Sequence, residues 1–399
     1  MTGSATAPRP HYVHVIRNAG TGGVETHVRS IIRLMQGAGF DVTLVSLAHE
    51  APHRQFSELG CAIVTLHDEG GWSWKTMRSG LALVGVLRRL RPDVIHVHGA
   101  RPILLGTLAA RAGAAGPVVC SLHGAHDLMA VREDGSIGAF GAWFARVVHG
   151  LGFLLSDAVV ICAGRLRHDV EVSLSTVTLG HPASALRKVA LVHHGIDLSP
   201  FASASPDRPE AGGRPYVIGT LCRLDEPKKG VAVLLKATAE LEARGIAVTL
   251  RIAGQGYSRK ALESRAAALG LRDCQFLGFV DDAPSFYATL DTFVLPSFSE
   301  GMPLVNIEAM AAGLPVVTSD VGGAAEAVLD GECGFVVPPG DATALASALE
   351  VLARDPKRRQ TFGQAGFARA RRDFSIEAMF HKLRDVYDGV SRPRGESRS

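Results

Sequence analysis

Short β-rich segments alternate with longer segments of helical periodicity along almost the whole chain, and this alternation limits the possible folds more than any other feature. Strands that alternate with helices form a mostly parallel sheet that helices cover on both faces. The pattern therefore predicts an α/β fold. The expected strands are 12–17, 42–47, 94–97, 118–122, 158–162 and 189–192, followed by 217–222, 248–253, 274–277, 292–295, 315–318 and 334–337.

The alternation is interrupted by a segment rich in Pro, Ala, Ser and Gly at residues 199–215. This composition is typical of a linker, and 399 residues exceed what one hydrophobic core usually organises. We therefore expect two Rossmann-like domains, 1–198 and 216–374. The last amphipathic segment, 375–390, has no strand after it and is expected to pack back on the N-terminal domain. The polar residues 391–399 are expected to be disordered.

The composition argues against several classes of protein. A net charge of +3 gives little attraction for nucleic acid. The six cysteines are far apart and form no CxxC pair, which argues against a disulfide framework or a cysteine zinc site. Residues 1–10 lack the apolar core of a signal peptide, and charged residues interrupt the most apolar segment, 137–163. We expect a cytoplasmic protein without a membrane-spanning helix.

A glycine-rich turn follows the first expected strand and contains Gly20, Gly22 and Gly23. In open α/β sheets, ligands bind at the carboxyl ends of the strands, where such a turn presents backbone N–H groups to phosphate. The spacing departs from the dinucleotide-binding pattern GxGxxG. A phosphate loop and an ordinary structural turn both fit this segment.

Basic residues follow the first strand of the second half, in the segment Arg-Leu-Asp-Glu-Pro-Lys-Lys-Gly. Arg223 offers a planar fork of donors to a diphosphate, and Lys228 or Lys229 adds a mobile positive charge. Such a pair can stabilise the charge that builds on a departing nucleoside diphosphate. The alternative is a solvated loop in which Asp225 and Glu226 are ordinary partners of these cations.

Two carboxylates lie in one segment between two apolar strands. Glu300 precedes a Gly-Met-Pro turn, and Glu308 lies on the helix that follows. Carboxylates accept hydrogen bonds from sugar hydroxyls, so Glu308 suits a ribose diol and Glu300 suits a hexose. Glutamates are common on helix surfaces. A pair that brackets such a turn within an apolar β-α-β unit nevertheless favours a nucleotide-sugar site.

Most of the sixteen histidines lie in the first half of the chain. His96 and His98 share one face of an expected strand, and His193 and His194 end another. No third ligand has a recognisable metal-site spacing, so we expect no bound metal and no cofactor. His123 ends a strand in Ser-Leu-His-Gly, where a neutral imidazole or the backbone carbonyl can face a reacting sugar.

The order of these segments along the chain matches a known family. The matching segments are 20–25, 121–124, 157–160, 194–197, 223–230, 253–256 and 278–280, together with Glu300 and Glu308. From about residue 11 to 390 the chain resembles the retaining glycosyltransferases of family 4, which have the GT-B fold of two Rossmann-like domains facing each other across a cleft. Residues 223–230 are similar to those of phosphatidylinositol mannosyltransferases, and bacterial polysaccharide glycosyltransferases share the pattern. His194-Gly195 departs from the Asn-Gly that is frequent in the family.

The resemblance implies how the donor diphosphate is held. Arg223 and Lys229 bind it from the C-terminal domain, and Lys229 matches the family lysine better than Lys228 because Gly230 follows it. The backbone at residues 22–23, Gly22 and Gly23, closes on the diphosphate from the other domain.

The resemblance also implies how the rest of the donor is recognised. The Val280 backbone binds the base edge, and Glu308 binds the ribose. The residues expected to be catalytic are Arg223, Lys229, Glu300 and His123. The residues expected to hold the donor sugar are Glu300, Gly301, Met302, Pro303 and Leu304.

The implied reaction moves a hexosyl unit from a UDP- or GDP-sugar to an acceptor hydroxyl, with retention and without metal. It would serve cell-surface polysaccharide, glycolipid or natural-product biosynthesis, and the N-terminal domain would bind a lipid-linked, saccharide or small-molecule acceptor. A sugar-nucleotide 2-epimerase on the same fold and a non-catalytic carbohydrate-binding scaffold are the alternatives. The sequence does not specify the nucleotide, the sugar or the oligomeric state.

Residues 72–90 raise the question of membrane contact. They combine tryptophans and aliphatic residues with Lys75, Arg78, Arg88 and Arg89. This composition suits an anionic membrane interface and would make the protein peripheral at the inner face of the membrane. A crossover helix that buries its apolar side on the sheet explains the same pattern.

Overall fold

A computed structural model describes residues 9–20, 22–48, 52–68, 74–124, 139–205, 207 and 213–391. The chain forms two compact units, one of Met1–His194 with Met379–Ser399 and one of Gly195–Ala378. We call them unit 1 and unit 2. Part of the expected linker and nearly all of the expected tail lie outside the described residues.

Unit 1 is built on a parallel seven-stranded sheet in the order β3-β2-β1-β4-β5-β6-β7. Strand β1 pairs with β2 on one side and with β4 on the other, and β2 pairs with β3. Its strands are β1 His11–Ile16, β2 Asp41–Ala48, β3 Ala62–Asp68, β4 Val94–His98, β5 Val118–Leu122, β6 Ala158–Ile161 and β7 Val189–Leu191.

Strand β3 is absent from the sequence-based prediction. It lies at the edge of the sheet, and Ile63, Val64 and Thr65 are only half-buried. A parallel strand in the middle of a sheet is apolar on both faces, whereas an edge strand needs less apolar sequence. The segment therefore lacks the signal by which its neighbours were recognised.

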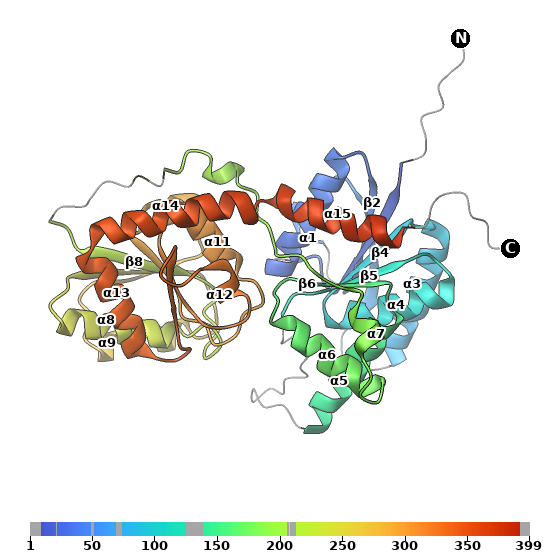
Figure 1. Ribbon diagram of the computed structural model, residues 1–399, viewed down its shortest axis with the longest axis horizontal. Coiled ribbons are helices and arrows are strands. Elements are labelled where there is room, and N and C mark those ends of the chain that lie inside the picture. The colour runs from blue at the N-terminus through green and yellow to red at the C-terminus, as the bar shows by residue number, and fades with distance from the viewer. Residues whose placement is uncertain are drawn as a thin grey trace, which may run out of the picture. The chain divides into compact units, whose positions relative to one another are not determined.

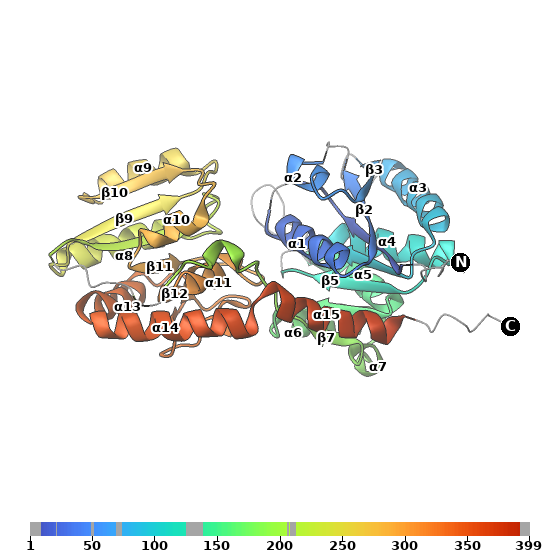
Figure 2. The ribbon, with the colours of Figure 1, turned by 90° about the horizontal axis from the view of Figure 1, so that it is seen from above.

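Helices cover both faces of this sheet (Figures 1 and 2). In α1, Val28, Ile31, Ile32 and Met35 recur at helical spacing and are completely buried, which fixes the helix on the sheet. The helices are α1 Gly23–Gly37, α2 Arg54–Ser57, α3 Trp74–Leu90, α4 Ala100–Gly113, α5 Ala139–Leu155, α6 Leu166–Val177, α7 Ala183–Leu186 and α15 Ile376–Val390.

The C-terminal helix α15 belongs to unit 1 from Met379 onward. Tyr387, on this helix, is buried, and its hydroxyl lies 2.6 Å from Nδ1 of His96 on β4. The ring of Tyr387 also contacts Tyr12 on β1 at a centroid distance of 5.1 Å. Residues at opposite ends of the sequence therefore share one core.

Unit 2 has a parallel six-stranded sheet in the order β10-β9-β8-β11-β12-β13. Helices α11 and α14 lie on one face and α8, α9 and α13 on the other (Figure 1). The strands are β8 Tyr216–Leu221, β9 Val248–Ala253, β10 Cys274–Gly278, β11 Thr292–Leu295, β12 Val316–Ser319 and β13 Gly334–Val337. The helices are η2 Ser199–Phe201, α8 Val231–Ala243, α9 Arg259–Ala268, α10 Ala283–Ala288, α11 Leu304–Ala311, α12 Ala324–Ala327, α13 Ala342–Arg354 and α14 Pro356–Asp373.

Each sheet reverses its strand order at one point, between β1 and β4 in unit 1 and between β8 and β11 in unit 2. The two folds thus confirm the predicted pair of Rossmann-like α/β layers. In such sheets ligands bind at the carboxyl ends of the strands beside the reversal. The loops after β8 and β11 are therefore where a ligand of unit 2 is expected.

Candidate active site

The predicted cationic segment and the predicted carboxylate segment meet at the reversal of strand order in unit 2. Residues 223–230 follow β8, and Glu300 follows β11, the strand that pairs with β8. The backbone N–H of Phe298 donates to the carbonyl of Lys228 at 2.9 Å. The two loops are therefore joined at the position where the fold predicts a ligand.

Lys229 and Glu300 form an ion pair at this position. Lys229 Nζ lies 2.6 Å from Glu300 Oε1, and Ser297 Oγ donates to the same oxygen at 2.7 Å. The side chains of Lys229 and Glu300 are 19% and 12% exposed, so solvent screens the pair little but still reaches it. The pair holds each charge in place, and an anionic or hydroxylated ligand can compete for either member.

Gly230 allows the two loops to approach. Its φ of 62° lies in the left-handed region, and a Cβ atom there would be 2.1 Å from the carbonyl oxygen of Pro296. No side chain can be accommodated at that distance. The glycine after Lys229 is therefore required by the contact that brings Lys229 to Glu300.

We expect Gly230→Ala to destabilise the protein by about 2 to 5 kcal/mol, because backbone strain adds to the clash with Pro296. Gly245→Ala is the matched control, since Gly245 has a φ of 80° and no atom near the added Cβ. Gly245→Ala should cost only the backbone strain, about 1 kcal/mol, without a steric clash. Urea denaturation followed by circular dichroism measures both. Equal destabilisation by the two substitutions would contradict a steric requirement at Gly230.

Arg223 is paired with Asp225 and makes no described contact with the ion pair. Its side chain is 79% exposed and its Nε donates to Asp225 Oδ2 at 2.7 Å. Oε1 of Glu226 accepts from the N–H of Val231 at 2.6 Å, at the start of α8. Among the described contacts, the structure therefore brings Lys229, but not Arg223, to the carboxylate of Glu300.

Glu308 lies on α11 and is held by a tyrosine. Tyr287, from α10, donates its hydroxyl to Glu308 Oε2 at 2.8 Å and also contacts the carbonyl of Val305 at 3.3 Å. Burial raises the pKa of Glu308, and the hydrogen bond from Tyr287 opposes that rise. Oε1 has no hydrogen bond among the contacts that the structure describes for Glu308, so this carboxylate can accept a further donor such as a ribose hydroxyl.

The turn between the two glutamates is largely buried. Gly301, Met302 and Pro303 are buried, and Leu304, at the start of α11, is half-buried. The carbonyl of Gly301 accepts from the N–H of Gly323 at 2.6 Å. The first N–H groups of a helix have no partner inside it, so the start of α11 offers donors beside Glu300.

Val280 is half-buried and follows β10, an edge strand that β9 separates from β8. No contact joins it to the Lys229–Glu300 pair in the described part of unit 2. Its predicted role at the base edge of a nucleotide stays a prediction.

Gly22 and Gly23 belong to unit 1, at the start of α1. Gly22 has extended backbone, and its carbonyl accepts from the N–H of Thr26 at 2.9 Å. A Cβ added at Gly23 meets no atom within 4 Å. Packing within the described part of unit 1 therefore does not require a glycine at position 23.

The ring of His123 is fully engaged by other histidines. Nε2 lies 3.2 Å from Nδ1 of His98, and Nδ1 lies 2.9 Å from Nε2 of His194. Burial lowers the pKa of His123 well below its ordinary value, so the ring is neutral. The carbonyl of His123 accepts weakly from Cys162 Sγ at 3.4 Å. Of the two expected ways for this residue to face a sugar, the carbonyl is the better placed.

Three contributions to these sites were not predicted from the sequence. Ser297 lies in the same loop after β11 as Glu300, and its place at the end of a strand is a signal that could have predicted it. Tyr287 comes from a helix with no local signal that it contacts Glu308. His27 lies on the apolar face of α1, and its ring centroid is 4.1 Å from that of His194.

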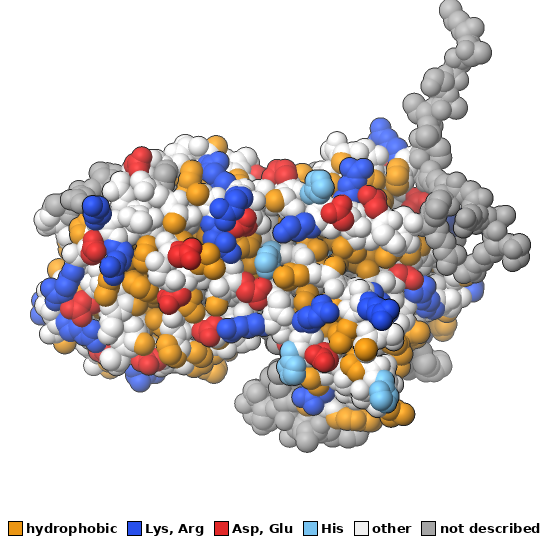
Figure 3. Space-filling model, in the orientation of Figure 1, with side chains coloured by type: hydrophobic (Ala, Val, Ile, Leu, Met, Phe, Trp, Pro, Cys, Tyr) orange, Lys and Arg blue, Asp and Glu red, His pale blue; other side chains and the backbone are white. Residues whose placement is uncertain are grey.

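The segment considered for membrane contact is largely α3. Trp72 lies outside the described residues. Leu83 and Leu87 are completely buried, as a crossover helix requires, whereas Leu81 is 69% exposed. Among the described residues, no helix combines the length and apolar character needed to cross a bilayer. Basic and acidic side chains are interspersed on the face that Figure 3 shows.

Comparison with protein families matches both halves of the chain. Residues 21–200 match the model described as "Glycosyltransferase Family 4", and residues 215–355 match the model described as "Glycosyl transferases group 1". The two matches cover the loops that carry the candidate residues of each unit.

Curated relatives agree with these matches. A phosphatidyl-myo-inositol mannosyltransferase from Mycobacterium leprae is 30% identical over 386 residues, which cover 93% of this chain and 94% of the relative. A glycogen synthase from Mycobacterium tuberculosis is 29% identical over 408 residues, which cover 94% and 92%.

Solved structures share the fold. Anabaena Alr3699/HepE, crystallised in complex with UDP-glucose, aligns with a TM-score of 0.75 at 19% identity and covers 95% of this chain and 99% of its own. Sucrose-phosphate synthase from Thermosynechococcus elongatus aligns with a TM-score of 0.75 at 21% identity and covers 95% and 98%. The chain belongs to the family 4, group 1 glycosyltransferases and has their GT-B fold.

Proposed function

We propose that this glycosyltransferase moves a hexosyl unit from a UDP- or GDP-sugar to an acceptor hydroxyl with retention of configuration. The observation that carries the proposal is the Lys229–Glu300 ion pair, which stands at the reversal of strand order in unit 2. A cation for the diphosphate and a carboxylate for the sugar are thereby adjacent before any ligand binds. An open sheet binds nucleotides at this place.

The proposed donor complex uses the residues around that pair. Lys229, and Arg223 once released from Asp225, neutralise the charge on the departing diphosphate. Glu300 then exchanges its contact with Lys229 for hydroxyls of the hexose, together with the turn at residues 301–304. Glu308, already fixed by Tyr287, takes the ribose, while the Val280 backbone takes the base.

In the proposed transfer step, no side chain of the protein acts as a nucleophile toward the sugar. The acceptor hydroxyl attacks the anomeric carbon from the face that the diphosphate leaves, and a leaving phosphate oxygen takes the hydroxyl proton. The two cations take the place of a divalent metal at the diphosphate, so added magnesium or manganese is not needed there. The carbonyl of His123 and the N–H groups at Gly22 and Gly23 would contact the reactants from unit 1.

The acceptor is proposed to be a lipid-linked or saccharide hydroxyl bound by unit 1. One curated relative is named for phosphatidyl-myo-inositol and another for glycogen, which supports these two classes. Exposed apolar side chains on unit 1, such as Leu81 on α3 and Trp143 on α5, support peripheral contact with a membrane. Sedimentation with anionic and neutral vesicles tests that contact.

A panel of UDP- and GDP-hexoses tests the proposed function. Thermal shift identifies the donor, because a ligand at 100 times its dissociation constant stabilises the protein by about 2.7 kcal/mol. Slow release of the hexose from that donor is the expected result. Conversion to a C2 epimer would show an epimerase on the same fold, and binding without turnover would show a non-catalytic scaffold.

We expect Glu308→Gln to weaken nucleotide binding by about 10- to 100-fold, because hydrogen bonds to a charged group contribute about 1.5 to 3 kcal/mol. The hexose-dependent part of donor affinity should not change. Glu263→Gln, at a half-exposed glutamate on α9, is the control. Calorimetry with UDP, GDP and the sugar nucleotide measures both. Unchanged affinity for both nucleotides in Glu308→Gln would remove Glu308 from the ribose site.

A further inference from the structure

A cluster of buried histidines fills the interior of unit 1 next to the carboxyl ends of its strands. Their exposed fractions are all 7% or less. The ring of His98 stacks on those of His14 and His123, and the centroids of the tilted His96 and His98 rings are 3.9 Å apart. Donor binding in unit 2 does not use them. The members are His14, His27, His96, His98, His123 and His194.

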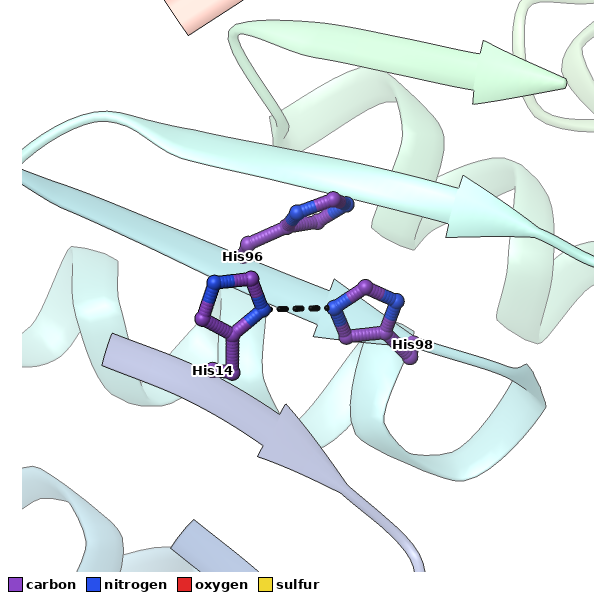
Figure 4. A group of neighbouring side chains, drawn as sticks. All are labelled: His14, His96 and His98. Carbon is purple, nitrogen blue, oxygen red and sulfur yellow. Dashed lines mark hydrogen bonds between the residues drawn. The ribbon is translucent and has the colours of Figure 1, made fainter. Parts of the chain in front are cut away.

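Four of these rings form a hydrogen-bonded chain. Nδ1 of His14 meets Nε2 of His98 at 3.0 Å, as Figure 4 shows. Likewise, Nδ1 of His98 meets Nε2 of His123 at 3.2 Å, and Nδ1 of His123 meets Nε2 of His194 at 2.9 Å. Nε2 of His14 lies 3.3 Å from the sulfur of Met35. A thioether has no hydrogen to donate, so every Nε2 in the chain donates and every Nδ1 accepts.

The chain therefore leaves the Nδ1 lone pair of His123 directed at His194, beside a small cavity. His27, His123, His194 and Cys162 line this cavity, whose volume of about 10 Å³ suits one water molecule or one metal ion. Nδ1 of His27 is buried and has no hydrogen-bond partner among the residues that the structure describes. A buried nitrogen without a partner is costly, which indicates that something polar occupies the cavity.

We propose that His27, His123 and His194 bind one zinc ion in this cavity. One ligand nitrogen from each of the three lies within 4.8 Å of the others, and all three residues are buried. Three imidazoles are a ligand set that zinc favours, with a fourth position left for water or for a thiol such as that of Cys162.

The nitrogens of His123 and His194 need only a small adjustment to bind zinc together. Zinc–nitrogen bonds of about 2.0–2.1 Å at tetrahedral angles separate the ligand nitrogens by about 3.3 Å. The nitrogens of His123 and His194 now lie 2.9 Å apart. In the other neutral tautomer of His194, the proton is on Nδ1 and the lone pair is on Nε2. The ion can then take the place of the hydrogen between His123 and His194.

The histidine chain supplies the outer partners that zinc ligands usually have. His123 donates Nε2–H to His98, which donates in turn to His14, so the orientation of the ligand ring is fixed back to Met35. The ion would join α1 to the segments after β5 and β7. Its proposed role is to hold these three segments together.

A second group of three, His14, His96 and His98, is less suitable. Both nitrogens of His96 are engaged, by the hydroxyl of Tyr387 at 2.6 Å and by that of Ser121 at 2.7 Å. His14 is engaged by His98 and Met35. An ion there would replace these bonds, whereas the cavity beside His27 leaves a nitrogen to be satisfied.

Calorimetric titration of the chelator-treated, full-length protein with zinc chloride tests the proposal. We expect one equivalent to bind to the wild type and affinity to be lost in His27→Gln. His98→Gln, which removes an outer partner, should weaken binding by about 10- to 100-fold. His96→Gln and His381→Gln, the latter at an exposed histidine on α15, should bind as the wild type does.

Cobalt(II) bound to the wild type gives a second measurement that does not depend on any variant. The intense visible bands of a tetrahedral ion are expected, and zinc should displace them. Loss of zinc binding in His96→Gln but not in His27→Gln would overturn the proposal in favour of the other group. Equal, weak binding by all variants, or an octahedral cobalt spectrum, would show adventitious binding only.

Discussion

Lys229→Ala is expected to lower the turnover of donor hydrolysis and transfer by about 100-fold or more, the usual effect of removing one preorganised electrostatic contact. Lys229 Nζ lies 2.6 Å from Glu300 Oε1. In the proposed reaction, Lys229 turns to the charge that builds on the diphosphate. The loss should therefore appear mainly in kcat, because the interaction strengthens in the transition state. Steady-state kinetics with the donor identified by thermal shift measures it.

Lys228→Ala is the matched control, since it removes the same charge one residue earlier in the loop. It should retain turnover within a few-fold. A circular dichroism melt of each variant separates loss of activity from loss of fold. If Lys229→Ala kept near-normal turnover, or if the two variants lost activity equally, the diphosphate role of Lys229 would be wrong.

The second large effect is a loss of stability of unit 1 in acid. Burial lowers the pKa of His14 to about 3, while an unfolded histidine titrates near 6.5. The folded ring stays neutral as the unfolded ring gains a proton, so the stabilisation is complete above about pH 6.5 and is lost as the pH falls toward 3. From pH 6.5 to 4.5, His14 alone should cost about 2.3 kcal/mol of the free energy of unfolding.

Tryptophan fluorescence follows this unfolding, because all three tryptophans belong to the chain segment of unit 1. Urea unfolding in the presence of a chelator, repeated at several pH values, gives the slope. His14→Gln should reduce the slope by about one proton, whereas His381→Gln should leave it unchanged. A free energy of unfolding that stays constant between pH 6.5 and 4.5 would show that these histidines are protonated in the folded protein.

The sequence predicts the central strands well because burial on both faces demands continuous apolar residues. Strands 248–253, 292–295 and 334–337 were predicted with the bounds that the structure gives them. Strand β3 was missed because an edge position relaxes that demand. The helix Ile376–Val390 was predicted from its amphipathic pattern.

The candidate site was predictable where it depends on position in the chain. Lys229 and Glu300 each follow an apolar strand, and the fold places the ends of β8 and β11 side by side. Their direct pairing depends on the approach that Gly230 permits, and a sequence does not show that approach. The contact of Tyr287 with Glu308 depends on packing between two helices.

In the histidine cluster, too, the sequence predicts some contacts and not others. His96 and His98 share a strand, so their proximity follows from spacing. His27 and His194 come from a helix and from a loop, and only the folded sheet brings them to His123. Spacing alone therefore predicted no metal ligand set in this part of the chain.

The configuration of the first-formed product tests the account most directly. The protein is incubated with the UDP- or GDP-hexose that binds most tightly and with a saccharide or phosphoinositide acceptor, and proton NMR records the anomeric signal before mutarotation. With an α-linked donor, we expect an α-linked product or, in slow hydrolysis, α-hexose at the earliest times. A β-configured first product would contradict retention, and no turnover with any donor in the panel would contradict the proposed reaction.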